Sequence, residues 1–551
     1  MNKWVLPLFF VLLIHLSACH TNAPDSHKTV FNINLEEGLT SLDPAFCRNR
    51  YTIWMDNQVF NGLVQVNDSL KVIPCIAKSW DVSADGLLYT FHLRNDVYFH
   101  DDAHFANGVG RRAAASDFVY SFSRLIDPKV ASSGSWIFSD KVEGKNAFTA
   151  PDDSTFKIRL KQPFAPFLSM LTAQYCSVVP KEVVEFYGKD FRSHPIGTGP
   201  FKFKYWKEGE VLVLLKNEKY WEKDGKGRRL PYLDAVKATF IADKQTSFLE
   251  FIKKKLDFLN DIDGSYRDDI LTKSGKVTQK YKGKFILNTA PYLNTMYLGI
   301  LVDTNLAIVK RSPLRILKVR QAINYAIDRQ KMMKYLRNSM GTPGYAGFIP
   351  EGMPGFSRAV KGYTYDPEKA RQLLAEAGFP DGKNLPEISL ATTVGYRSLI
   401  EYVQGQLDRI GIRTSVEITQ GASLRELVSK NGINFFYGQW IADYPDGENY
   451  LSVFYSKNKI PHGPNYTGFN NKKFDALFEQ TYHIKNDSAR YALYQQMDNL
   501  VMEQSPVVVL YYDKLVNLYQ DNISGYSLNG QNLLVLKRVV KAPWSVARGV
   551  N

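Results

Sequence analysis

The second half of the chain contains a strand–helix–strand pattern, which limits the fold class more than any other feature of the sequence. Residues 388–391 form a short apolar run, and residues 398–409 place apolar side chains on one face of a predicted helix. Gly411 ends this helix, and residues 412–418 then alternate between apolar and more polar side chains. Two strands joined by such a helix pair in parallel, so the sequence predicts an α/β fold.

Other local patterns predict further elements on both sides of this unit. Asp366 and Pro367 are a typical helix start, because an acidic side chain caps free N–H groups and proline fits the first turn. Residues 80–93 predict a β-hairpin, and residues 201–206 and 211–215 predict a second strand pair. A chain of 551 residues also exceeds the size of one domain, which is typically about 150 residues.

The N-terminus has the pattern of an export signal. Lys3 precedes the apolar run 4–14, which is shorter than the roughly 20 residues that a membrane span needs. The following Leu-Ser-Ala-Cys sequence resembles a bacterial lipobox ending at Cys19. We therefore expect a signal peptide at 1–18, lipidation of Cys19 and a lipidated tether at 19–28. An ordinary signal peptide with a coincidental cysteine is the alternative.

This start predicts a protein held on the extracytoplasmic side of a membrane by its N-terminal lipid. The net charge is +14, but the basic residues are dispersed, so nucleic-acid binding is not expected. Besides Cys19 the chain has Cys47, Cys75 and Cys176, which allow at most one intramolecular disulfide. No Cys-x-x-Cys motif or Cys/His cluster predicts a structural metal or another cofactor.

The sequence lacks the common catalytic motifs. A Gly-x-Ser-x-Gly elbow, a P-loop and a His-Glu-x-x-His motif are all absent. His100 and His104 have a spacing that suits a metal on a helix, but they follow a predicted strand in a Gly- and Asn-rich stretch, which favours a solvated loop. These absences favour a binding protein over an enzyme.

Several short segments, taken in order, resemble the family-five solute-binding proteins, the extracytoplasmic peptide, dipeptide and nickel receptors of ABC importers. The resemblance covers nearly the whole mature chain and depends on the order and spacing of its pieces. They include IPCIAKSW (73–80), SADG (83–86), VYFHD (97–101), RLIDP (124–128), GTGPF (197–201), VRQAI (319–323), YDPEKA (365–370), QLDRIGI (406–412) and WIADY (440–444).

The resemblance implies a two-lobe, type II periplasmic-binding-protein-like fold with an extra domain in the N-terminal half. By analogy, lobe one comprises 29–72, 195–288 and 506–551, the extra domain is 73–194, and lobe two is 289–505. The chain then crosses between the lobes twice, which allows them to hinge shut on a ligand.

The sequence departs from the family pattern at one place. The family usually has glycine after the His-Asp pair, whereas Asp102 follows Asp101 here. Residues 103–112 then resemble an insertion, whose role the sequence does not reveal.

The family resemblance also suggests where a peptide is held. Asp443 matches the position that binds the α-amino group of a peptide, where a desolvated carboxylate forms a strong hydrogen bond to an ammonium group. An Asx turn leading to Pro445 is the alternative. Trp440 and Tyr444 are expected to line the cleft, although Trp440 is equally explained as part of the core.

Four further residues are candidates for ligand contact. Tyr437 stands where some peptide receptors carry a cation for the ligand carboxylate, and Arg397 lies near another carboxylate-binding region of the family. Asn294 and Tyr297 follow a predicted hinge crossing and are expected to meet the ligand backbone. A plain surface residue is the alternative for Arg397.

The expected function is that of a lipid-anchored, monomeric receptor that binds peptides and delivers them to an ABC permease and ATPase complex. No catalytic residue and no metal ligand is assigned. The alternatives are the same role for a nickel chelate, haem or an oligosaccharide, an envelope hydrolase, and a peptide sensor without transport.

Overall fold

The computed structural model describes residues 28–544, and the predicted signal peptide and Cys19 lie outside them. Within these residues, eleven strands form one large sheet, which confirms the α/β class. Listed across the sheet, they are β15 (Thr414–Thr419), β14 (Ile388–Thr393), β16 (Phe435–Ile441), β12 (Ile286–Ile300), β17 (Val507–Tyr519), β11 (Phe258–Asn260), β1 (Val30–Asn34), β10 (Ala235–Thr239), β9 (Val211–Lys216) and β8 (Phe201–Lys207), with β13 (Thr342–Pro343) beside β17.

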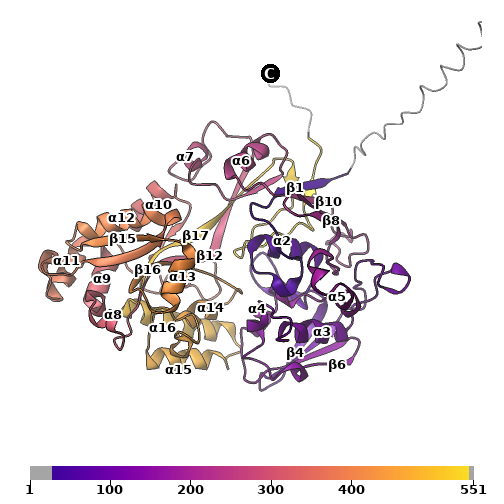
Figure 1. Ribbon diagram of the computed structural model, residues 1–551, viewed down its shortest axis with the longest axis horizontal. Helices are drawn as coiled ribbons and strands as arrows, with labels where there is room; N and C mark the ends of the chain where they lie inside the picture. Colours follow the sequence, from indigo (N-terminus) through magenta and orange to yellow (C-terminus); the bar gives the residue numbers. More distant parts are fainter. Residues whose placement is uncertain (1–27, 545–551) are drawn as a thin grey trace, which may run out of the picture.

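Two long antiparallel strands, β12 and β17, lie in the middle of this sheet and belong to both lobes. The first residues of β12 pair with the last residues of β17, next to β11 of lobe one. The other half of β12 pairs with β16 of lobe two. Figure 1 shows this pair running between the two halves of the molecule. These strands are the two crossings that the family resemblance implies.

The pairing of β12 with β17 is interrupted at the crossing. Pro291 pairs with Lys514 and Thr295 pairs with Tyr512, so three residues of β12 face a single residue of β17. An insertion of this kind bends a strand and turns its side chains in new directions. Leu293 in the bulge is held by a hydrogen bond from its N–H to the carbonyl of Gly530.

The elements predicted from sequence patterns around lobe two are confirmed. Strands β14 and β15 pair in parallel and are joined by α12 (Arg397–Asp408). Helix α11 (Pro367–Glu376) begins after Asp366, whose side chain accepts a hydrogen bond from the N–H of Lys369. The predicted strand pair after residue 200 forms β8 and β9.

The extra domain has a sheet of its own. Its strands lie in the order β4 (Ala77–Val82), β5 (Leu88–Leu93), β7 (Thr155–Arg159) and β6 (Phe148–Asp152), all antiparallel, which confirms the predicted hairpin. Apolar residues of α3 (Ala115–Leu125) pack against this sheet. The domain limits predicted from the family resemblance remain a prediction.

The remaining described helices surround the large sheet. They are α2 (Arg50–Val59), α4 (Phe167–Met170), α5 (Lys181–Tyr187), α6 (Lys244–Ile252), α7 (Arg267–Ile270), α8 (Ala307–Lys310), α9 (Leu317–Ala326), α10 (Arg329–Leu336), α13 (Gly421–Ser429), α14 (Glu448–Leu451), α15 (Lys472–Thr481) and α16 (Asp487–Gln504). The short pairs β2 (Val64–Val66) with β3 (Val72–Pro74) and β18 (Ile523–Ser524) with β19 (Val540–Lys541) complete the strands.

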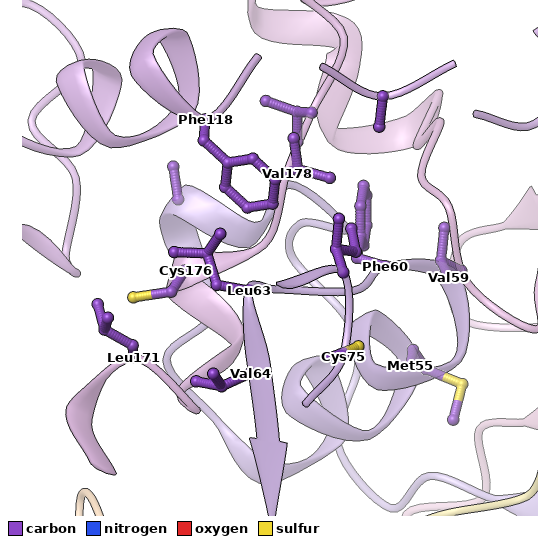
Figure 2. Close-up of a cluster of buried hydrophobic side chains, with 14 of the residues drawn as sticks. Met55, Val59, Phe60, Leu63, Val64, Cys75, Phe118, Leu171, Cys176 and Val178 are labelled. Carbon is purple, nitrogen blue, oxygen red and sulfur yellow. The ribbon is translucent and has the colours of Figure 1, made fainter. Parts of the chain in front are cut away.

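The cysteines within the described residues are buried and free. Cys75 and Cys176 belong to the apolar cluster behind α2, where Leu63 separates them in the view of Figure 2. Burial raises the pKa of the Cys75 thiol to about 12. The disulfide that the cysteine count permitted is therefore not formed among Cys47, Cys75 and Cys176.

The extra domain touches lobe two directly. The rings of Phe164 and Tyr482 meet edge to face at 5.2 Å between centroids. The Lys485 ammonium group donates hydrogen bonds to the carbonyls of Ser83 and Ala84, at 2.9 and 3.0 Å. The lobes are thus joined both by the crossing strands and by this separate set of contacts.

The turn before β8 fixes the C-terminal end of α2. A β-carbon built at Gly199 would lie only 2.5 Å from the Gln58 carbonyl oxygen, and one at Gly197 would overlap the carbonyl of Val59. The imidazole of His100 donates from Nε2 to the carbonyl of Gly199 at 3.0 Å. Glycine is required at both positions because the two backbones are in contact.

Gly199→Ala is expected to lower the free energy of unfolding by about 1–3 kcal/mol, because backbone atoms must move to admit the methyl group. The control is Gly405→Ala. Gly405 lies exposed within α12, where a β-carbon would meet nothing within 4 Å. The control should raise stability by about 0.5–1 kcal/mol. Urea unfolding checks both signs, and equal effects at the two sites would contradict the close approach.

Candidate functional site: a cavity between the lobes

A cavity of about 350 Å³ lies where lobe one, the extra domain and lobe two meet. This volume is at the lower end of the range for small-molecule sites, roughly 300–1,000 Å³. Its walls come from distant parts of the chain. The lining residues are Cys47, Arg48, Arg50, Ile53, Trp54, Trp136, Thr172, Ala173, Gln174, Tyr175, Tyr292, Ile441, Ala442, Asp443, Gln531, Asn532 and Leu533.

Asp443 stands on the lobe two wall, just after the end of β16. Its carboxylate accepts a hydrogen bond from the Asn449 side-chain amide at 3.3 Å, and its backbone N–H donates to the Asn449 side-chain oxygen, Oδ1, at 3.3 Å. The Trp440 indole N–H donates to the same oxygen at 3.0 Å. Asn449, at the start of α14, is therefore held by Trp440 and in turn orients Asp443.

The environment of Asp443 is accessible but poorly solvating. Its side chain is exposed to the cavity, yet the surrounding protein raises the pKa of its carboxyl group by desolvation, and the Asn449 hydrogen bond partly opposes this rise. Asn449 is its only hydrogen-bond donor within residues 28–544. A carboxylate in this situation gains more than a solvated one from a cationic partner.

Aromatic side chains from the extra domain and the crossing form much of the remaining wall. Trp136 and Tyr175 come from two short 3-10 helices of the extra domain, Ser135–Ile137 and Gln174–Cys176, and Tyr292 comes from the bulge of β12. Burial raises the pKa of Tyr175, and among charged neighbours the Arg48 guanidinium lowers it while the Asp443 carboxylate raises it. Tyr175 is therefore within electrostatic reach of both charged walls.

Tyr444 joins the lobes instead of lining the cavity. Its ring is buried and stacks on Trp136 at 6.2 Å between centroids, and its hydroxyl donates to Glu448. Trp440 is half-buried in the lobe two core and acts on the cavity through Asn449. Of these two candidates from the family pattern, neither has a side chain on the cavity wall.

The other four candidates also lie away from the cavity lining. Tyr437 is buried and stacks on Tyr396 at 4.2 Å, facing the opposite side of β16 from Trp440 because side chains alternate along a strand. Arg397 is exposed at the start of α12. Asn294 and Tyr297 are buried on β12, where Tyr297 packs on Phe348. Their proposed contacts with a ligand remain a prediction.

Arg48 and Arg50 were not identified from the sequence, and neither were Trp136, Tyr175 and Tyr292. The two arginines flank Asn49, whose side chain caps α2 by accepting a hydrogen bond from the N–H of Thr52. An N-cap asparagine is visible in a sequence, but it does not reveal that the helix start faces a cavity.

The histidine pair at the insertion does not form a metal site. His100 is buried, and burial lowers the pKa of its imidazole to about 4. The Nδ1 atom of His104 lies 2.6 Å from the Asp102 carboxylate. Within residues 28–544, no group of three or more His, Cys, Asp or Glu side chains is arranged to hold a metal ion.

The insertion at 103–112 is anchored to the extra domain by Arg111. Its guanidinium forms ion pairs with Asp117 at 2.6 Å and Glu182 at 2.5 Å. It also lies 5.2 Å from the centre of the Phe99 ring. The insertion is thus an ordered part of the surface of this domain.

A family model described as bacterial extracellular solute-binding proteins, family 5 middle, matches residues 71–462. The chain belongs to this family. Its members bind solutes and are not enzymes, and they serve as the substrate-binding components of ABC importers outside the cytoplasm. The sequence-based family and fold assignments are therefore confirmed.

The names of three similar proteins state different solutes. The glutathione-binding protein GsiB of Salmonella choleraesuis is 27% identical over 88% of this chain and 90% of its own. Heme-binding protein A of Haemophilus influenzae is 29% identical over 82% and 80%. The solved structure of the periplasmic binding protein DppA from Helicobacter pylori, in complex with the peptide STSA, matches with a TM-score of 0.74, 24% identity and coverage of 93% and 98%.

The part of the family-five chain that the structure describes has no helix long and apolar enough to cross a membrane. The apolar N-terminal run lies outside the described residues. Lipidation of Cys19 therefore remains a prediction.

Glu448 is a buried titratable group at the contact between lobe two and the extra domain. Burial, the largest cause, and the neighbouring Asp446 both raise the pKa of its carboxyl group, which reaches about 7. The Tyr444 hydrogen bond and the charges of Lys141 and Arg490 act in the opposite direction. A raised pKa means that folding favours the protonated form, which stabilises the folded state at low pH.

The stabilisation from protonated Glu448 should be lost as pH rises from about 5 to about 7. Relative to Glu448→Gln, the wild-type protein should lose up to about 1.4 kcal/mol of unfolding free energy per pH unit in this interval, and little above it. Urea unfolding at several pH values measures the difference. Glu401→Gln, on the exposed face of α12, is the control for removing a surface charge. A difference that does not vary with pH would contradict the burial argument.

Proposed function

We propose that this protein is the peptide receptor of an ABC importer, closing its two lobes on a short peptide and delivering it to the permease. The observation that carries the proposal is Asp443. It is the only acidic side chain among the described residues of the cavity wall, and it is oriented by Asn449. A desolvated carboxylate of this kind suits the ammonium group of a peptide N-terminus.

The cavity composition supports a polar ligand of modest size. Amide and phenol groups from Gln174, Tyr175, Gln531 and Asn532 provide donors and acceptors for a peptide backbone. Its volume corresponds to roughly a dozen water molecules at about 30 Å³ each. A short peptide fits this volume better than a long one.

The proposal includes the predicted N-terminal features. Export by the signal peptide at 1–18 and lipidation of Cys19 would hold a monomeric receptor at the membrane that contains the permease. A Cys19→Ala variant that appears in the soluble fraction after cell lysis, while the parent protein stays with membranes, would support the anchor.

Asp443→Asn should reduce the affinity for short peptides at least tenfold, because a neutral amide loses the charge-assisted bond to the ammonium group. Isothermal titration calorimetry with an alanine dipeptide and tripeptide, and with their N-acetylated forms, measures this loss. The acetylated peptides should bind weakly to both proteins.

Asp408→Asn, on the exposed end of α12, is the control substitution and should bind like the parent protein. Haem titration followed by absorbance tests the main alternative ligand. Unchanged peptide affinity in Asp443→Asn, or tight haem binding without peptide binding, would refute the proposed function.

A further inference from the structure

The cavity carries an excess of positive charge that one zwitterionic peptide does not neutralise. Its described charged lining residues are Arg48, Arg50 and Asp443. Both arginines lie on the lobe one wall at the N-terminal end of α2, and Asp443 lies on the wall of lobe two. The charges are therefore separated across the space that a ligand would occupy.

Neither arginine has an acidic partner. Within residues 28–544, neither Arg48 nor Arg50 forms a side-chain hydrogen bond or an ion pair, and Arg50 only approaches the Tyr51 ring, at 5.5 Å. The acidic residues nearest to them in the sequence, Asp43 and Asp56, form no ion pair with either arginine. Asp43 receives a hydrogen bond from Arg124 at 2.7 Å, and burial beside Cys47 raises the pKa of the Asp56 carboxyl group.

The cations also act on the aromatic walls of the cavity. The Arg48 guanidinium lowers the pKa of Tyr175, and the Arg50 guanidinium lowers that of Tyr292, each against the larger effect of burial. The start of α2 adds the partial positive charge of its free N–H groups on the same wall. Three features of positive potential thus face one carboxylate.

A simple dipeptide offers one ammonium group and one carboxylate. Its ammonium group would satisfy Asp443 and its carboxylate one arginine, which leaves the second guanidinium facing the ligand without a counter-charge. Both guanidinium groups are exposed without a ligand, but a ligand that fills the cavity displaces their water, and a charge that loses water without gaining a partner costs free energy. A second carboxylate on the ligand removes that cost.

We propose that the ligand of this cavity is a short peptide with two carboxylates and one ammonium group, and that Arg48 and Arg50 bind the two carboxylates. This inference depends on the proposed peptide-binding function and specifies its ligand class. It replaces Arg397, the candidate from the family pattern, with two side chains that line the cavity.

Matched dipeptides test the charge requirement. Ala-Glu carries two carboxylates. Ala-Gln has nearly the same shape but an uncharged side chain, and Ala-Lys carries a positively charged side chain. Calorimetry at low salt should give an affinity for Ala-Glu at least tenfold above that for Ala-Gln, with Ala-Lys weakest. The pair Ala-Ala-Glu and Ala-Ala-Gln repeats the comparison for a longer ligand. The preference should shrink as salt is added.

Substitution tests the assignment to the two arginines. Arg48→Gln and Arg50→Gln should each weaken binding of the glutamate peptides at least tenfold, and the double variant should bind glutamate and glutamine peptides equally. Arg425→Gln, which removes an exposed arginine of α13 outside the cavity, should leave the preference unchanged. Thermal unfolding of each variant confirms that the exposed substitutions leave the fold intact.

The possible results separate the two proposals. If glutamine peptides bind as tightly as glutamate peptides and Asp443→Asn abolishes both, the peptide function stands and the ligand-class inference is overturned. It is also overturned if the glutamate preference survives in the double variant. If none of the peptides binds, the proposed function fails and the inference fails with it.

Discussion

The antiparallel pairing of β12 with β17 is the constraint on which the rest of the structure depends. Each strand contributes backbone hydrogen bonds to both lobes, so the lobes share one continuous sheet. The pairing is broken only near the crossing, where the bulge of β12 carries Tyr292 to the cavity. The place where the sheet is least regular is thus the place where the lobes meet the candidate ligand.

The charged groups of the cavity are separated, with positive side chains on one wall and a negative side chain on the other. Lobe one contributes Arg48 and Arg50, lobe two contributes Asp443, and the phenol of Tyr175 lies within reach of both signs. Under the proposed function, closing the lobes brings opposite charges towards each other across the space for a ligand. A guest with its own separated charges stabilises that closed arrangement, whereas an apolar guest of equal size leaves the charges unpaired.

Local sequence patterns predicted individual helices and strands, and the family resemblance predicted the two-lobe architecture. Neither predicted more than a part of the cavity wall. The strand–helix–strand unit at β14, α12 and β15 follows directly from apolar periodicity. Tyr437 and Trp440 were both candidates for ligand contact, yet a separation of three positions along a strand puts the two side chains on opposite faces. Trp136 and Tyr175 lie in 3-10 helices of three residues each, which are too short to show a periodic pattern, and only the tertiary fold brings them to Asp443.

The extra domain contributes Trp136, Gln174 and Tyr175 to the cavity, while the crossing strands belong entirely to the two lobes. Part of the cavity wall is therefore built by a domain that contributes no strand to the crossing. Substitutions in the loops of this domain can therefore change which ligand is bound without changing the strands that join the lobes. One fold can in this way acquire different ligand selectivities.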